Sequence, residues 1–140
     1  MVFNWKCILN SHCVLLSNFV YYNYLIRNDS IIQTLDEDKI TDHLKAPELI
    51  SNYAKSINEI VVRKAVKRYL FRGLESYIMS CKNYLYKHPK IDFNYRKKMI
   101  NFISHQRIKL NQMSVKLFAI CFISIIDVRM IYAIHKIINK

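Results

Sequence analysis

The chain has 140 residues, 52% of them hydrophobic, and its 22 basic and 10 acidic side chains give a formal net charge of +12. This length fits one domain with or without an extension, and this hydrophobic content excludes a globally disordered chain. One glycine and two prolines supply few turn signals, which disfavours a β-hairpin fold and favours long helices. The abundance of Ile, Asn, Lys and Tyr also fits an AT-rich genome, which raises the basic count without any functional cause.

The charge is unevenly distributed along the chain. Residues 1–28 carry two bases and no acid (+2), residues 29–60 carry seven acids and three lysines (−4), and residues 61–140 carry seventeen bases and three acids (+14). The last part therefore suits an acidic protein, a phosphate-bearing group, nucleic acid or an anionic membrane. We expect an N-terminal extension over residues 1–58 and a basic helical domain over residues 59–140.

The extension is expected to combine a candidate targeting segment with an acidic linker or helix. Residues 1–28 fit either a mitochondrial presequence with few arginines or an ordinary buried helix. Within them, the apolar run 7–26 contains three asparagines and a histidine, so it is a poor transmembrane helix. Residues 29–46 are polar and acidic and form a linker or a short helix. A helix over about 47–58 is expected to have Pro47 in its first turn, where proline loses no hydrogen bond.

The basic domain is expected to begin with a long helix. From residue 59 to about 87, apolar side chains recur at intervals of three and four, as on one face of an α-helix. This stripe comprises Val62, Val66, Leu70, Leu74, Tyr77, Cys81 and Leu85. Gly73, the only glycine, costs about 1 kcal/mol relative to alanine inside a helix, so it is expected where another backbone or a ligand approaches closely.

Two more helices are expected after the stop signal at Pro89. The second runs from about residue 93 to 109, with Asp92 as its cap, and the third covers about 111–138, with an apolar first half that indicates a central position. Short connections favour antiparallel packing. The predicted fold class is therefore all-α: an antiparallel three-helix bundle with an N-terminal helical extension.

The sequence contains no pattern typical of an active site. There are no paired carboxylates at a useful spacing, no glycine-rich loop and no local Ser-His-Asp or Cys-His signature. The protein is therefore not expected to be an enzyme, to bind a metal or to hold a cofactor directly. The four cysteines form no CxxC pair and are expected to be reduced thiols that pack as small hydrophobes. His135 lies on an apolar stripe and is expected to be a core or edge histidine.

Two basic clusters are the candidate binding residues: Arg63, Lys64, Lys67 and Arg68 in the first helix and Arg96, Lys97 and Lys98 in the second. They form either a solvated face or an anion-binding surface built by two adjacent helices. Aromatic side chains lie beside them in the sequence and suit either nucleic-acid stacking or core packing: Tyr69, Phe71, Tyr95 and Phe102.

Three segments, AVKRYLFRGLESY, FNYRKKMINFISHQR and IIDVRMIYAIHK, resemble the LYR-motif family of small mitochondrial three-helix proteins. The resemblance covers about residues 62–136. Leu70, Phe71 and Arg72 stand where family members have Leu-Tyr-Arg, and Phe102 stands where they have a phenylalanine in a basic second helix. The chain departs from the pattern in the phenylalanine of the triplet, in the isoleucine after Phe102, in a longer first connection and in its first sixty residues.

The resemblance implies an adaptor in the mitochondrial matrix that binds the acyl carrier protein and a client, either a respiratory complex or the iron–sulfur assembly machinery. The acidic partner would bring the acyl-phosphopantetheine group. The resemblance assigns seven bases to the carrier protein and its phosphate: Lys67, Arg68, Arg72, Arg96, Lys97, Lys98 and Arg107. It assigns the acyl chain to apolar space beside Gly73, Leu74 and Phe102, and it implies that Arg72→Ala alone abolishes capture.

Two other classes of protein remain open. A viral or parasite helical-bundle decoy of the Bcl-2-like kind needs the first sixty residues as integral helices and a groove for its partner. Truncation at Glu59 unfolds such a decoy, whereas an adaptor keeps a stable core. A basic RNA-binding accessory protein instead shows steep salt dependence and loses affinity as several lysines are neutralised together.

Overall fold

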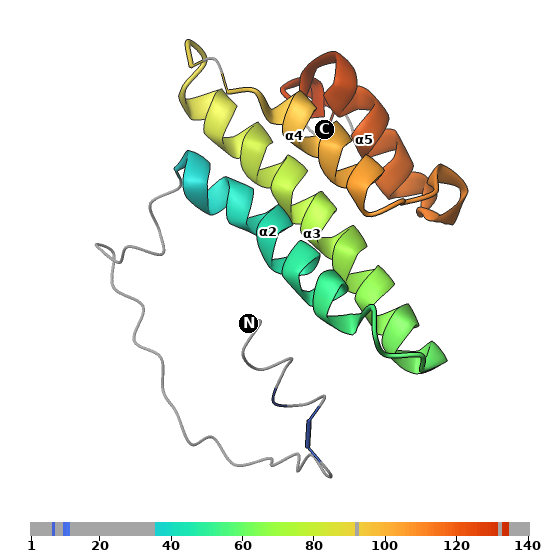
Figure 1. The fold of residues 1–140 in the computed structure, drawn as a ribbon. Coiled ribbons are helices and arrows are strands. Elements are labelled where there is room, and N and C mark those ends of the chain that lie inside the picture. The colour runs from blue at the N-terminus through green and yellow to red at the C-terminus, as the bar shows by residue number, and fades with distance from the viewer. Residues whose placement is uncertain (1–6, 8–9, 12–35, 92, 132, 135–140) are drawn as a thin grey trace, which may run out of the picture.

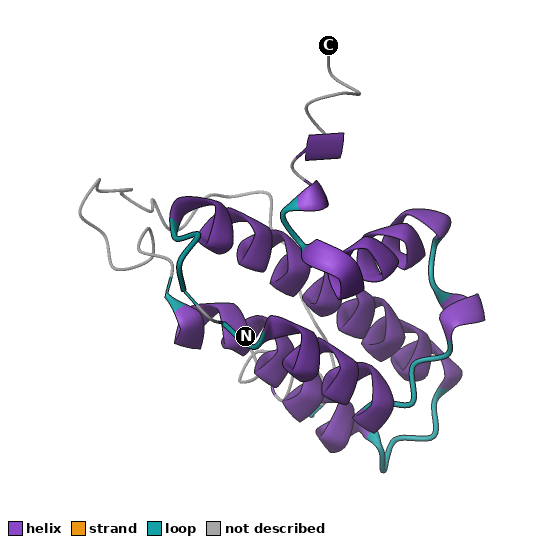
Figure 2. Cartoon of the chain, turned by 90° about the horizontal axis from the view of Figure 1, so that it is seen from above, coloured by secondary structure: helices purple, strands orange, loops and turns teal. Residues whose placement is uncertain are grey.

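The computed structural model describes residues 7, 10–11, 36–91, 93–131 and 133–134. This part of the chain consists of helices and connecting loops and has no strand (Figures 1 and 2). Its elements are α2 (Glu37–Ala54), α3 (Ile60–Lys87), α4 (Tyr95–His105), the 3-10 helix η2 (Leu110–Gln112) and α5 (Val115–Asp127). The predicted all-α class is confirmed, and the described residues contain four α-helices. The predictions for residues 1–28 lie almost wholly outside the described residues.

Helix α2 begins earlier than expected. Asp36 is its N-cap: the carboxylate accepts a hydrogen bond from the Lys39 amide at 2.8 Å, and two further acids in the first turn favour the same start. The prediction that a helix starts at Pro47 was wrong, because this proline lies inside α2. Proline has no amide hydrogen, so the carbonyl of His43 loses its helical partner there while the helix continues.

The only glycine of the chain lies where α2 and α3 approach most closely. A Cβ atom built on Gly73 would stand 2.7 Å from the His43 carbonyl oxygen and closer still to the Pro47 ring. Side chains do not tolerate such distances, so only glycine allows this approach. The expectation of a close backbone contact at Gly73 is therefore confirmed, and the approaching element is α2. The two helices run side by side over most of the length of α2 (Figure 1).

One hydrophobic core joins α2 to the helices that follow it. Ile40 and Ile50 of α2 are fully buried in the same cluster as Leu74 and Tyr77 of α3 and Met99 of α4. Polar side chains reinforce the contact between α2 and α4: the ammonium of Lys98 donates to the Thr41 hydroxyl at 3.0 Å. The predicted division between residues 58 and 59 falls in the α2–α3 loop, but the core extends across it.

Helix α4 is shorter than the predicted range 93–109. Its N-cap position is Asn94, and the expected cap, Asp92, lies outside the described residues. The helix ends because Arg107 has a φ of 49°, in the left-handed region. The Ile108 amide donates to the Ile103 carbonyl and the Arg107 amide to the Ser104 carbonyl, each at 3.0 Å, which is the hydrogen-bond pattern of a Schellman termination.

The single third helix expected over residues 111–138 is interrupted. Ser114 caps α5 by accepting a hydrogen bond from the Leu117 amide at 3.2 Å, and the helix ends at Asp127. Beyond it, the amide of Val128 donates to the Tyr95 hydroxyl at 3.1 Å, away from the helix axis. Helical geometry resumes only at residues 130–131 and 133–134. His135 lies outside the described residues.

Candidate functional site

A cavity of about 360 Å³ lies where the end of α2, the first half of α3 and the loop after α4 meet. Its apolar lining includes Ala54, Ile57, Val66, Leu70, Phe71 and Ile108. Four bases from three parts of the chain also line it: Lys55, Arg63, Lys67 and Arg107. We call this site the cationic cavity. It combines an apolar wall with positive charge, so it suits a ligand that has an anionic group and an apolar part.

Among the described residues, no carboxylate neutralises the cationic cavity. Its lining contains no acidic residue, and none of its four bases forms an ion pair within the described part of the chain. Arg63 and Lys55 donate to neutral amide side chains, Lys55 to the Asn52 oxygen at 2.7 Å. The Lys67 ammonium lies 5.7 Å from the centre of the Phe71 ring. The cavity therefore keeps a positive potential that attracts anions.

Arg107 occupies a backbone conformation that favours glycine or asparagine. A non-glycine residue in the left-handed region costs about 1 kcal/mol, and such costs concentrate at functional positions. The Arg107 side chain lines the cationic cavity, as does Lys67 of α3. The sequence around residue 107 contains no glycine that would have signalled a helix end here.

The seven bases assigned from the sequence do not converge on one site. Lys67 and Arg107 line the cationic cavity, whereas Arg72 lines a separate groove between α2 and α3. Arg68 and Lys97 are exposed and line none of the three cavities described here. Sequence reasoning missed Lys55, because nothing in the pattern indicates that the end of α2 returns to the first half of α3.

The three residues assigned to an acyl chain pack within the protein. Leu74 and Phe102 belong to the hydrophobic core, and Leu74 is fully buried. Gly73 lines the groove of Arg72 between α2 and α3, at a point where an added Cβ atom would meet Pro47 and the His43 carbonyl. Apolar volume next to several bases lies in the cationic cavity, on the side of α3 that presents Leu70 and Phe71.

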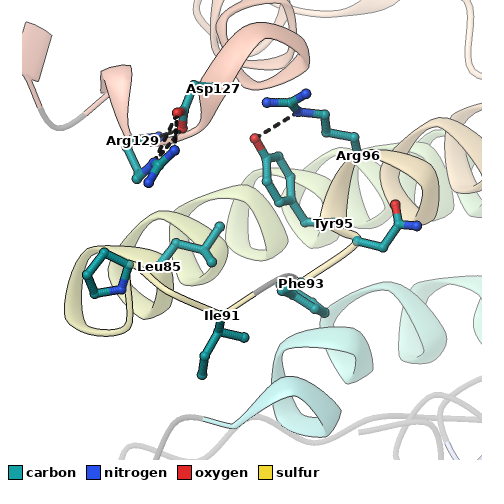
Figure 3. Close-up of a pocket in the computed structure, with 9 residues that line it drawn as sticks. Leu85, Ile91, Phe93, Tyr95, Arg96, Asp127 and Arg129 are labelled. Atoms are coloured by element: carbon teal, nitrogen blue, oxygen red, sulfur yellow. Dashed lines mark hydrogen bonds and ion pairs between the residues drawn. The ribbon is translucent and has the colours of Figure 1, made fainter.

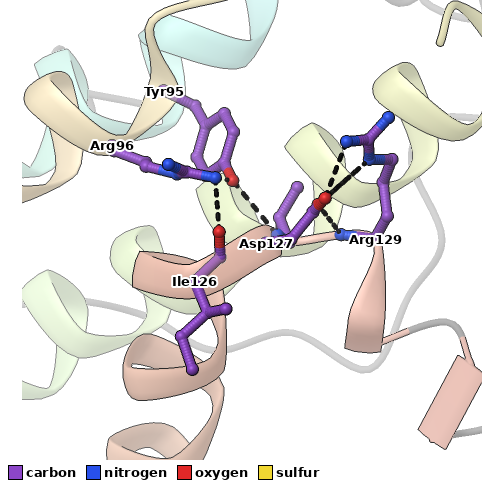
Figure 4. Close-up of polar contacts among 6 residues, drawn as sticks. Tyr95, Arg96, Ile126, Asp127 and Arg129 are labelled. Atoms are coloured by element: carbon purple, nitrogen blue, oxygen red, sulfur yellow. Dashed lines mark hydrogen bonds and ion pairs between the residues drawn. The ribbon is translucent and has the colours of Figure 1, made fainter.

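Arg96 lines a third cavity, of about 340 Å³, between the end of α3, the start of α4 and the end of α5 (Figure 3). Its guanidinium donates to the Tyr95 hydroxyl at 3.1 Å and to the carbonyl of Ile126 (Figure 4). Across the cavity, Asp127 and Arg129 form an ion pair of 2.7 Å, and this hydrogen bonding lowers the pKa of the Asp127 carboxyl. The polar groups of Tyr95, Arg96, Asp127 and Arg129 therefore have hydrogen-bond or ion-pair partners within the protein. We interpret the third cavity as a structural junction between α4 and the end of α5.

The Tyr95 hydroxyl is the centre of this junction, and we expect its removal to destabilise the protein. Tyr95→Phe leaves the fully buried Val128 without a partner for its amide, which costs about 1 to 3 kcal/mol. Chemical denaturation should show this loss at unchanged helical content. As a control, Asn101→Ala alters an exposed side chain of α4 and should change stability by about 0.5 kcal/mol or less. Equal stability of the two variants would contradict the role of Tyr95.

The two buried thiols, Cys81 and Cys121, have no features of a reactive site. Burial raises the pKa of Cys81 to about 12 and that of Cys121 to about 11, so both are protonated near neutral pH. Among the described residues, His, Cys, Asp and Glu side chains do not cluster in groups of three or more that suit a metal ion. No described helix is both long enough and apolar enough to cross a membrane.

Comparison of the chain with protein-family models, with curated proteins and with solved structures finds no match.

Proposed function

We propose that the protein is an adaptor that binds an acidic protein partner through the cationic cavity and the basic surface around it. Following the resemblance, the partner is an acyl carrier protein in the mitochondrial matrix, and the adaptor links it to a client such as a respiratory complex or the iron–sulfur assembly machinery. The observation that supports this proposal is the combination of four bases, no acid and an apolar wall in one cavity.

The chemistry of the cavity matches an acyl-phosphopantetheine arm. Lys67 and Arg107 would bind the phosphate by charge-assisted hydrogen bonds, which are about twice as strong as neutral ones. Leu70 and Phe71 offer apolar surface to the chain that follows the phosphate. The net charge of +14 over residues 61–140 attracts an acidic helix before contact. In this proposal, Arg72 supports the surface from the neighbouring groove.

Capture of acyl carrier protein by the full chain tests this proposal. The tagged protein is purified from a bacterial host, and intact-mass spectrometry identifies what co-purifies. We expect an acidic carrier protein with an acyl-phosphopantetheine mass, and we expect Lys67→Met with Arg107→Asn to lower capture about tenfold or more. Asparagine tolerates the left-handed backbone, so this pair removes charge at little cost to the fold.

Lys87→Met with Lys90→Met is the matched control, since it removes the same charge from exposed positions near the other end of α3, outside the cavity. Equal loss in both double variants, with nucleic acid in the eluate, would instead favour a basic RNA-binding protein. Loss in Arg72→Ala together with full capture by the Lys67/Arg107 variant would place the site at the motif and overturn the role of the cavity.

A helical-bundle decoy is the second candidate function, because one specific observation favours it. This class requires helices from the first sixty residues as integral parts of the fold, and α2 contributes Ile40, Leu44 and Ile50 to the common core. In that case the cationic cavity would receive side chains from an amphipathic helix of the partner. Co-purification without any phosphopantetheine mass, but with a partner helix that competes for the cavity, would support this candidate.

A further inference from the structure

The outward side of α5 carries an apolar stripe that the described part of the chain leaves uncovered. It comprises Val115, Phe118, Phe122, Ile125 and Ile126, which recur at helical intervals along the whole element. Val115 is 87% exposed and Phe122 60%. The opposite side of the helix packs into the core through Leu117 and Cys121. We call the exposed side the α5 stripe.

The α5 stripe differs from ordinary exposed apolar residues. Single exposed apolar side chains are normal, but a continuous stripe of large ones on a single helix marks a binding surface. A helix that is apolar on all sides normally lies buried. In α5 the only charged residues are Lys116 and Asp127, and helical geometry places both outside the stripe.

Bases outnumber acids in the part of the chain that contains the α5 stripe. Residues 93–131 contain seven bases and one acid, a net charge of +6. The one acid, Asp127, is already paired with Arg129 at 2.7 Å. Arg96 of α4 reaches the carboxyl end of α5 by donating to the carbonyl of Ile126 (Figure 4). At the other end, Lys116 keeps 76% of its side chain exposed while pairing with Glu75.

We propose that the α5 stripe docks the protein on an anionic lipid surface. Phe118 and Phe122 enter the boundary between headgroups and acyl chains, while Arg96 and Lys116, at the two ends of α5, attract the anionic headgroups. Thirteen residues give α5 a length of about 20 Å, shorter than the hydrocarbon core of about 30 Å, so the helix lies in the plane of the surface. This inference is independent of the cationic cavity and of the proposed adaptor function.

The charge of the chain favours a membrane over a second copy as the occupant. Two copies that each carry +12 repel one another at every distance within the Debye length, and the α5 stripe offers no acid to offset that repulsion. An anionic bilayer supplies both an apolar layer for the stripe and negative charge for the nearby bases. An anionic bilayer therefore matches both the apolar stripe and the nearby bases.

Vesicle flotation with the full-length chain tests the proposal. Vesicles of phosphatidylcholine with phosphatidylserine are compared with vesicles of phosphatidylcholine alone. We expect binding to the anionic vesicles, weakened by added salt because screening shortens the attraction, and little binding to the neutral ones. Phe118→Ser with Phe122→Ser should lower the partition by about an order of magnitude or more. Both side chains are largely exposed, so the fold should remain.

Leu49→Ser with Ile60→Ser is the matched control, since it removes two other exposed apolar side chains, from α2 and α3, and should leave flotation unchanged. Equal flotation of the two double variants would overturn α5 as the contact. Equal flotation with neutral vesicles would overturn the role of charge. A change from dimer to monomer in light scattering on Phe118→Ser with Phe122→Ser, without flotation of the native chain, would make a second copy the occupant and overturn the membrane proposal.

Discussion

Gly73→Ala is expected to lower the free energy of unfolding by about 2 kcal/mol or more, although alanine is the better helix former by about 1 kcal/mol. The new Cβ atom would stand 2.7 Å from the His43 carbonyl oxygen and would overlap the Pro47 ring. Neither neighbour is a flexible side-chain end, so α2 and α3 have to separate, which opens the core along their contact. Urea denaturation followed by far-UV circular dichroism measures the loss.

Two further variants make this test specific. Asn83→Ala, at an exposed position of the same helix, should change stability by about 0.5 kcal/mol or less. Pro47→Ala removes part of the overlap, so the double variant Pro47→Ala with Gly73→Ala should be more stable than the sum of the two single effects predicts. A Gly73→Ala protein at least as stable as the native chain would show that the two helices do not approach as described.

Truncation at Glu59 is expected to abolish cooperative folding. It removes α2, whose three large aliphatic core residues are Ile40, Leu44 and Ile50. At about 2 to 5 kcal/mol for each lost side chain, the sum is about 6 to 15 kcal/mol, which equals the whole stability of a typical domain. The remaining helices would also expose the side of α3 that α2 covers. Thermal melts of residues 59–140 should show a broad, non-cooperative loss of helix.

A chain that begins at Asp36 is the control for this truncation. It keeps the whole of α2 and the cap that Asp36 provides through the Lys39 amide. We expect it to melt cooperatively. A cooperative melt of residues 59–140 with native helical content would instead establish that range as an independent domain, as the LYR-like interpretation expects. Unfolding of the same fragment would show that α2 is an integral part of the fold, which the decoy interpretation needs and which the cationic cavity of the proposed adaptor also needs, because Ala54 of α2 lines that cavity.

The sequence predicted α3 almost completely and α2 poorly. The observed helix Ile60–Lys87 nearly coincides with the expected range 59–87, because its apolar stripe is regular and Pro89 ends it. Helix α2 was placed too late because Pro47 was interpreted as a first-turn proline. The acidic start at Asp36 was the better signal, since its carboxylate provides the cap.

The candidate site shows why binding residues are harder to predict than helices. Periodicity indicates which side of a helix is apolar, but it does not indicate which basic side chains of different helices meet. Lys67 and Arg107 line one cavity, and Arg107 is the left-handed residue at which α4 ends. The sequence has no glycine there that would have predicted this helix end. Lys55 reaches the same cavity because α2 folds back along α3. Contacts between residues that are distant in the sequence cannot be predicted from the periodicity of a single helix.

The contact between Pro47 and Gly73 also fixes the alignment of α2 along α3. A slide of one helical turn, about 5.4 Å, would bring the proline ring against Tyr69 or Tyr77, each of which has a bulky side chain. Because the chain contains no second glycine, no other alignment offers the proline an equivalent space. The contact between Pro47 and Gly73 therefore allows a single register of α2 along α3. It excludes shifted packings of α2 that the apolar stripes alone would permit.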